Sequence, residues 1–223
     1  MSDPVYCYPP DYSVLKNLPG YRDQSQLDAF ERAATLERSR QGIPTGNFDL
    51  KHLQAIHGHL FQDVYAWAGK LRTVEIEKGG HQFQFRQYIE TGMADIYKRL
   101  KDDNFLKGRS AEAFAKGAGE IIGDVNYVHP FRDGNGRTQL QYLKLLGAQA
   151  GHELDLARLE RSSWIEASRE AHKANYKPMS ACIASTVAGR TPHTPEIEAL
   201  KKKLGDIRPS QVRSRDVDDD RSR

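Results

Sequence analysis

The residues best suited to chemistry lie within ten positions, from Val128 to Arg137, where the chain reads VHPFRDGNGR. His129 is a side chain that can take a proton from a hydroxyl near neutral pH. Asp133 would be a natural Mg²⁺ ligand beside a polyphosphate, because Mg²⁺ commonly takes one carboxylate together with phosphate oxygens. The segment therefore combines a candidate general base with a candidate metal ligand.

Three residues of the same segment, Gly134, Asn135 and Gly136, precede a stretch with helical periodicity. Backbone N–H groups at such a position can converge on an anion, and the helix dipole adds positive potential there. Arg137 is placed to hold a second phosphate by paired hydrogen bonds. Taken singly, the turn is more often a loop device, the histidine structural and the arginine a surface cation. The combination favours nucleotide-dependent transfer.

Two helices must position these residues. Apolar residues at helical spacing predict one helix from Ser110, a suitable N-cap, to Val128, which places His129 at its C-terminal end. Leucines at 140, 143 and 146 predict a second helix that Gly151 can end. The segment is therefore expected to form a helix-loop-helix corner.

The rest of the chain also follows mainly helical periodicity. Asn47 or Asp49 can cap the helix expected at 50–61. A capping box from Ser163 to Glu166 begins the helix expected at 163–171, and Pro178 opens the helix expected at 178–189. The five helices are expected at 25–41, 50–61, 88–100, 163–171 and 178–189.

One segment has a different period. Between positions 71 and 85, apolar and polar residues alternate around Gly79 and Gly80, which predicts a β-hairpin. The expected fold class is therefore all-α, a helical bundle with one β-hairpin. Prolines and tyrosines predict an irregular N-terminal arm at 1–24. The helices predict a single domain at 25–189, and the mixed charge beyond it predicts a disordered tail at 190–223.

Composition excludes some classes of partner. The 33 basic and 30 acidic side chains leave a formal charge of +3, too balanced to require a nucleic acid or an anionic membrane. Cys7 and Cys182 lie in no CxxC motif, which argues against a disulfide framework or a zinc site. There is no apolar run of about 18 residues and no signal-peptide pattern. We expect a cytoplasmic protein, with delivery into a host cell as the alternative.

The stretch His129 to Arg137, HPFRDGNGR, resembles the signature of Fic domains, HxFx(D/E)GNGRxxR, at every position through Arg137. The helical frame with its upstream hairpin is similar to that family over 50–189. The resemblance implies a Fic-type helical bundle that transfers AMP from ATP to a Ser, Thr or Tyr hydroxyl of a target protein. It implies His129 as general base, Asp133 as Mg²⁺ ligand, and Gly134, Asn135, Gly136 and Arg137 as phosphate ligands.

The resemblance also implies that the hairpin is a flap on which the target backbone pairs as an added strand. Residues of a later helix often line the nucleoside pocket in the family. Here Trp164, Ser168 and His172 share one helix face, so Trp164 and His172 are candidates, with a core role for Trp164 equally expected. The flap is the hairpin from Thr73 to Phe85, and its candidate target-docking residues are Thr73, Val74, Glu75, Ile76, Glu77, Lys78, Gly79 and Gly80.

Two departures from the family pattern concern nucleotide binding and the inhibition of activity. The last arginine of the signature is replaced by Leu140, so either Lys144 holds the γ-phosphate or binding is weakened. A charge-assisted contact is worth about 1.5–3 kcal/mol, which predicts reduced rather than absent activity. The family's inhibitory pattern (S/T)xxxE(G/N) has no clear copy, since its nearest match, Thr73 to Glu77, continues with Lys78. The chain therefore resembles toxin-type members inhibited by a separate small antitoxin.

Two alternatives remain open from sequence. A transferase of the same fold could use another donor or move a phosphoryl group. A degenerate module could act by binding alone, which Leu140 supports and which the intact His129, Asp133 and Arg137 disfavour.

Overall fold

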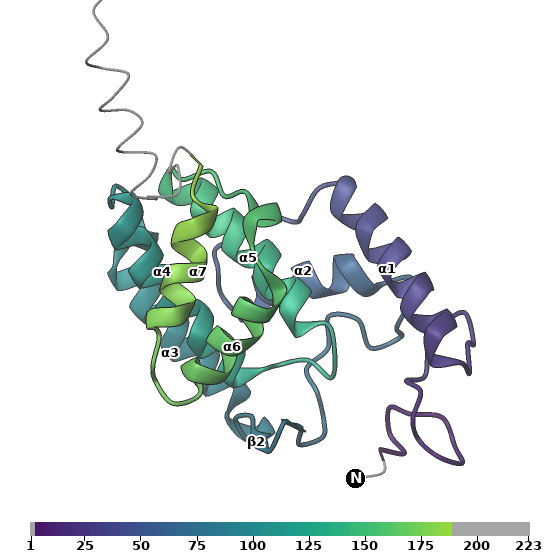
Figure 1. Ribbon diagram of the computed structural model, residues 1–223. Helices are drawn as coiled ribbons and strands as arrows, with labels where there is room; N and C mark the ends of the chain where they lie inside the picture. Colours follow the sequence, from purple (N-terminus) through teal and green to yellow (C-terminus); the bar gives the residue numbers. More distant parts are fainter. Residues whose placement is uncertain (1–2, 189–223) are drawn as a thin grey trace, which may run out of the picture. The chain divides into compact units, whose positions relative to one another are not determined.

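Residues 3–188 of this computed structural model are described here, and they are built mainly from α-helices (Figure 1). The all-α class predicted from periodicity is confirmed. The predicted tail at 190–223 lies outside the described residues. The helices are α1 (Gln24–Arg40), α2 (Leu50–Phe61), α3 (Ile89–Asp102), α4 (Ala111–Val128), α5 (Asn135–Ala150), α6 (Arg161–Ala171) and α7 (Lys177–Thr186).

α4 is the central helix, and it packs against α3, α5, α6 and α7. Figure 1 shows α3, α4 and α7 on one side of α5, with α2 and α1 on the other. Close approach of α7 depends on small residues of α4, because a Cβ at Gly119 would lie 2.9 Å from the backbone nitrogen of Ser180. The fully buried aromatic side chains Phe61, Phe114, Phe131 and Tyr142 belong to the core that these helices enclose.

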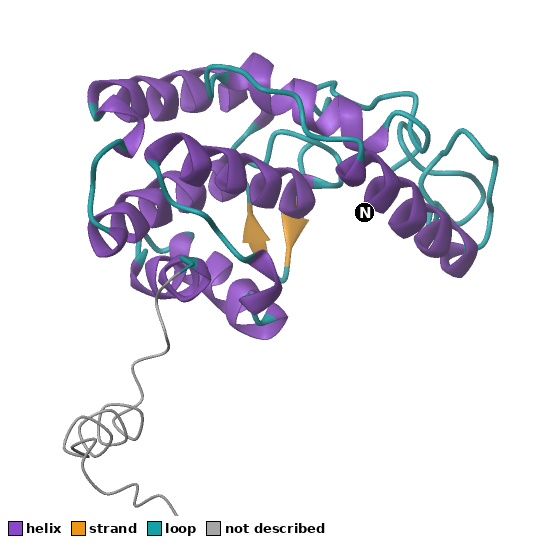
Figure 2. Ribbon diagram, turned by 90° about the horizontal axis from the view of Figure 1, so that it is seen from above, coloured by secondary structure: helices purple, strands orange, loops and turns teal. Residues whose placement is uncertain are grey.

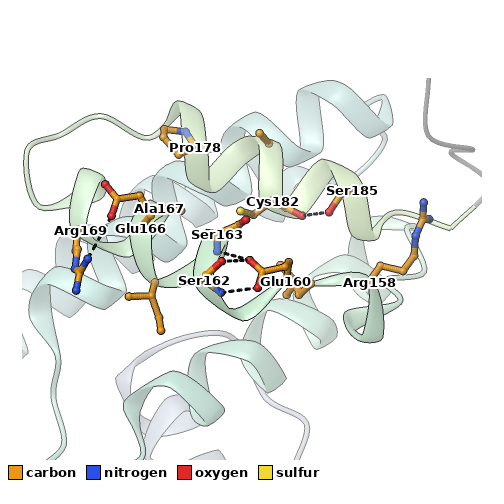
Figure 3. A pocket seen from close by; sticks show the side chains of 13 residues that line it. Arg158, Glu160, Ser162, Ser163, Glu166, Ala167, Arg169, Pro178, Cys182 and Ser185 are labelled. Carbon is orange, nitrogen blue, oxygen red and sulfur yellow. Dashed lines mark hydrogen bonds and ion pairs between the residues drawn. The ribbon is translucent and has the colours of Figure 1, made fainter. Parts of the chain in front are cut away.

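Most helix ends follow local chemistry. The helix expected at 178–189 instead ends, as α7, at Thr186, where Val187 is extended and forms a bridge with Leu154. Ser110 caps α4 and Gly151, at φ 91°, ends α5, as predicted. The predicted capping box at Ser163 is wrong, because α6 begins two residues earlier at Arg161. The carboxylate of Glu160 accepts the N–H groups of both Ser162 and Ser163, at 3.0 and 2.6 Å, which satisfies this helix end without a capping box (Figure 3).

The hairpin is shorter than the alternation predicted. β1 (Glu77–Lys78) pairs with β2 (His81–Gln82) in antiparallel register, with Gly79 and Gly80 at positive φ in the turn (Figure 2). One further bond crosses the hairpin, from the N–H of Phe83 to the carbonyl of Ile76 at 3.2 Å, and the next N–H, that of Gln84, donates to the carbonyl of Tyr127 in α4 at 3.1 Å. The hairpin is therefore attached to α4 at its base.

The N-terminal segment before α1 follows an irregular path and is anchored by tyrosine. Tyr6 is 7% exposed, packs edge-on against Trp67, and its hydroxyl accepts the N–H of Thr73 at 3.1 Å. Cys7 and Cys182 are free thiols. Within residues 3–188, no helix has the length and apolar character needed to cross a membrane.

Candidate active site

His129 stands at the C-terminal end of α4 in the left-handed conformation, with φ 47° and ψ 63°. Its Nδ1 lies 3.0 Å from the carbonyl oxygen of Asn126. A carbonyl can only accept, so this bond places the proton on Nδ1 and the lone pair on Nε2. Burial lowers the pKa of His129 to about 3, and the positive charges of Lys78 and Arg72 act in the same direction. The imidazole is therefore neutral at pH 7, the form that can accept a proton.

The flap covers this imidazole. Phe83 stacks on His129 with ring centroids 3.7 Å apart and lies 5.0 Å from the ring of His172. His81, also from the hairpin, lies 5.8 Å from His172, and burial lowers the pKa of His172. The structure thus brings the predicted residue His172 from the end of α6 to the flap, on the same side as His129.

The corner after His129 leaves backbone donors available at the start of α5. Thr138 makes the first intrahelical hydrogen bond, to the carbonyl of Gly134 at 3.1 Å, so the N–H groups of residues 135–137 have no intrahelical acceptor. Gly134 needs its φ of 78°, and a Cβ there would lie 2.4 Å from the ring of Phe61. A Cβ at Gly136 would meet no atom within 4 Å. The helix end is therefore open to an anion at Gly136 and closely packed at Gly134.

The side chain of Asn135 has a structural part in this corner. Its Oδ1 accepts the N–H of Phe131 at 3.0 Å, and its Nδ2 donates to the carbonyl of Phe131 at 2.8 Å. Asn135 is buried, so the group it leaves for an anion is its backbone N–H.

Asp133 is exposed, while its backbone is braced from α2. His57 donates from Nε2 to the carbonyl of Asp133 at 3.0 Å, and its Nδ1 accepts the N–H of Gly69 at 2.8 Å. The ring is stacked on Phe131, with centroids 4.0 Å apart. Burial lowers the pKa of His57 to about 4, so it stays neutral and serves as a fixed support for the loop.

Arg137 is held from α1. Its guanidinium donates to the carboxylate of Glu31 at 2.5 Å and lies over the ring of Phe61, 4.6 Å from the centroid. Glu31 also accepts the hydroxyl of Tyr65. A guanidinium has five N–H donors, so this contact orients Arg137 and leaves donors for a phosphate.

One cleft joins the flap to the corner. It has a volume of about 740 Å³ and contains His129, Asp133, the flap and Asp3 of the N-terminal segment. Arg132 also lines it and pairs with Asp3 at 2.6 Å. Of the predicted site residues, Trp164, His172 and 134–137 are not among the lining residues, and Trp164 is partly buried against the hydrophobic core. Arg86, just after the flap, also lines the cleft, and the flap residues of the lining are Thr73, Val74, Glu75, Ile76, Glu77, Lys78 and Phe83.

A second hollow of about 800 Å³ lies between α6 and α7 (Figure 3). It includes Glu160, Ser163 and Cys182, and no residue that the sequence predicted for the site lines it. Its polar groups already have partners, since Glu160 caps α6 and Ser185 donates to the carbonyl of Cys182. The cleft at His129 is the better candidate for chemistry.

Several supporting residues escaped sequence reasoning. His57, Glu31 and Arg72 contact the motif from positions far away in the chain. Each is polar and lies where the local period predicts only a helix or a hairpin. The available signal was a polar residue at an inward-facing position, such as His57 between Ile56 and Leu60 on α2.

Asp133 is the candidate metal ligand of the corner. Within residues 3–188 no group of three or more His, Cys, Asp or Glu side chains could hold a metal ion. Asp133 offers a donor set of one exposed carboxylate in the cleft lining, directly before the glycine turn in the sequence. That set fits Mg²⁺, which completes its shell with phosphate oxygens and water.

Comparisons with known proteins agree with this geometry. Residues 47–146 match the model of the Fic/DOC family. The chain is 40% identical over 184 residues to "Probable protein adenylyltransferase y4lH" of Sinorhizobium fredii, covering 82% of this chain and 95% of that protein. It is also 40% identical over 178 residues to "Protein adenylyltransferase VbhT" of Bartonella schoenbuchensis, covering 78% of this chain and 37% of that longer protein.

Solved structures show the same fold. The BepC effector protein of Bartonella tribocorum, solved with bound AMPPNP, superposes with a TM-score of 0.74 at 26% identity, over 83% of this chain and 97% of that one. The N-terminal Fic domain of a Bartonella quintana effector, solved with bound ADP, gives a TM-score of 0.71 at 28% identity, over 78% and 91%.

Proposed function

The chain belongs to the Fic/DOC family, and from that premise we propose that it is a protein adenylyltransferase, which moves AMP from ATP to a hydroxyl side chain of a target protein. One observation carries the proposal. A neutral His129 with its lone pair on Nε2 lies in one cleft with Asp133, and α5, which begins two residues after Asp133, has N–H groups at 135–137 without an intrahelical acceptor. A base beside an anion site is what nucleotidyl transfer requires.

In the proposed reaction, Nε2 of His129 takes the proton of the target hydroxyl as its oxygen attacks the α-phosphorus of ATP. The new bond joins that oxygen to phosphorus, and the bond from phosphorus to the bridging oxygen breaks, so pyrophosphate leaves. The N–H groups of residues 135–137 and the guanidinium of Arg137 stabilise the charge on the phosphate oxygens. His172 lies next to the flap for a role at the nucleoside, while Trp164, partly buried against the core, is proposed as a packing residue.

We further propose that Asp133 holds Mg²⁺ bound to the nucleotide. When bound, the ion supplies charge neutralisation to the phosphates. The exposed carboxylate of Asp133 supports this assignment, because its other contact, with the N–H of Gly134, leaves oxygen lone pairs to spare.

The flap is proposed to receive the target. Glu77 and Lys78 of β1 are both exposed, and in the described sheet β1 pairs only with β2. An extended segment of the target can therefore add to the outer edge of β1, which brings its hydroxyl toward His129.

We also propose that a separate small antitoxin-type protein restrains the enzyme. Support comes from the sequence, which has no clear copy of the inhibitory pattern. The proposal is tested by purifying the tagged protein from its own cells and using mass spectrometry to identify any small protein that co-purifies with it in stoichiometric amount.

The activity is tested by incubating the protein and Mg²⁺ with a bacterial lysate and either α- or γ-³²P-labelled ATP. AMP transfer predicts label from the α position, and mass spectrometry then identifies the modified hydroxyl. His129→Ala should abolish the label, while His59→Ala, which removes a histidine outside the cleft, should retain it. Label from the γ position alone would instead support phosphoryl transfer, and no label with either donor would support binding alone.

A further inference from the structure

Arg72 is a buried cation at the base of the flap, with a side chain that is 0% exposed. Within residues 3–188, the hydrogen bonds of its side chain all go to the flap or to the end of α4. Nε donates to the carbonyl of His129 at 2.8 Å, Nη1 to the carbonyl of Val74 at 2.8 Å and to the carboxylate of Glu75 at 3.2 Å, and Nη2 to the carbonyls of Gln84 and Val128.

These contacts join three segments at one point. Val74 lies before β1 and Gln84 after β2, so the guanidinium holds both ends of the flap. The same group holds the carbonyl of His129, and the backbone N–H of Arg72 donates to the carbonyl of Pro130 at 2.9 Å. The flap and the candidate base are therefore fixed to a single planar group.

Stability alone is a poor account of this arrangement. Moving a charge out of water costs several kcal/mol per ion, and apolar replacements of buried ion pairs are often neutral or stabilising. Glu75 is Arg72's acidic partner, and its side chain is 41% exposed. What a guanidinium adds over an apolar residue is a rigid fork of donors with fixed directions.

We propose that Arg72 is a positioning residue for AMP transfer, which sets the distance between a target hydroxyl docked on the flap and Nε2 of His129. The inference rests on the proposed function. Phe83 shows how direct the coupling is, because it immediately precedes Gln84 and stacks on the imidazole. The phosphate corner at 134–137 has no contact with the guanidinium among the described residues, so nucleotide binding should be independent of Arg72.

The test compares Arg72→Lys and Arg72→Gln with Arg99→Lys, a control in an ion-paired arginine of α3 that lies outside the cleft. Lysine keeps the charge but cannot make the fork. Initial rates of labelling from α-³²P-ATP are measured against lysate concentration, and ATP affinity is measured by calorimetry. Misplacing a reacting group by about 1 Å can cost on the order of 100-fold, so both Arg72 variants should lose between about 10-fold and 100-fold in rate.

ATP affinity should be unchanged in both Arg72 variants, and Arg99→Lys should match the unaltered protein in both measurements. Amide hydrogen exchange gives a second readout, because the N–H of Phe83 and of Gln84 are bonded to Ile76 and Tyr127 and should exchange faster when Arg72 is replaced. A purely structural role would lower rate, ATP affinity and thermal midpoint together, and would overturn the inference.

The outcomes also separate this inference from the proposed function. Full labelling by the Arg72 variants, beside a labelled unaltered protein, overturns the inference alone. An unaltered protein that binds ATP and transfers no α-label overturns the proposed function, and with it a positioning role in AMP transfer.

Discussion

The ring of Phe83 lies nearly parallel to the imidazole of His129, with centroids 3.7 Å apart and planes 19° apart. Phe83 comes from the flap and is 6% exposed, while His129 ends α4. This stack removes one face of the imidazole from water. It links the position of the flap to the protonation of the candidate base, because desolvation is the main cause of the lowered pKa.

Replacing Phe83 should therefore change the titration of His129. In Phe83→Ala the imidazole gains water, so its pKa should rise from about 3 toward the ordinary 6.5. Phe83→Leu is the matched control, because it keeps an apolar cover. Proton NMR of the His129 ring should show a shift between pH 8 and 5 in the alanine variant and none in the unaltered protein. Identical titration in both would show that other groups desolvate the imidazole.

Two histidines with lowered pKa values, the buried His57 and the partly buried His129, should make the fold sensitive to acid. The pKa values of His129 and His57 are lowered from 6.5 to about 3 and about 4, so the unfolded chain binds protons that the folded chain does not. The contribution of the two histidines to the free energy of unfolding should be fully present above pH 6.5. It should fall as the pH drops toward their pKa values in the folded protein, by about 1.4 kcal/mol per pH unit for each histidine. Urea unfolding at pH 7.5 and 5.5 measures the difference.

The variant that isolates one contribution is His57→Gln, whose amide can both donate to Asp133 and accept from Gly69. It should reduce the slope of the free energy of unfolding against pH by the equivalent of about one proton, or about 1.4 kcal/mol per pH unit. An unchanged slope would mean that His57 does not remain neutral in the folded protein.

Local signals explain what the sequence could predict. Ser110 caps the start of α4 and Gly151 the end of α5 as expected, because a helix cap depends on a few neighbouring residues. The corner from His129 to Arg137 is equally local, so its place between two helices followed from the periodicity of α4 and α5. The hairpin turn was predicted correctly at Gly79 and Gly80, which have positive φ.

Non-local contacts explain what it could not predict. The hairpin was expected to be longer, because nothing nearby indicates that Arg72 takes the carbonyls of Val74 and Gln84. Glu31 reaches Arg137 across 106 positions. Such pairs depend on how α1 and the flap pack against the corner, which no single-sequence pattern encodes.

Two glycines of the corner should respond differently to alanine. Gly134→Ala forces a side chain into φ 78° and into the ring of Phe61, so it should cost about 2 kcal/mol or more of stability. Gly136→Ala meets no atom within 4 Å and should leave the thermal midpoint unchanged or slightly higher. Its methyl group would instead crowd a bound phosphate, and ATP affinity should fall while the fold persists.

Thermal unfolding and calorimetric titration with ATP and Mg²⁺ separate these two effects. Normal ATP affinity in folded Gly136→Ala would show that the phosphates of ATP do not bind at this corner.

The last prediction concerns Leu140, which lies one turn after Gly136 on the same face of α5 and is half-buried. Leu140→Arg would place a guanidinium within reach of a terminal phosphate. A charge-assisted contact adds about 1.5–3 kcal/mol, which is roughly tenfold to 100-fold in dissociation constant. Affinity for ATP should rise by that factor, while affinity for AMP, which lacks the terminal phosphate, should stay the same. Leu140→Met controls for packing, and Lys144→Gln reports whether the exposed Lys144 holds that phosphate in the unaltered protein. An equal gain for ATP and AMP would place Leu140 away from the terminal phosphate.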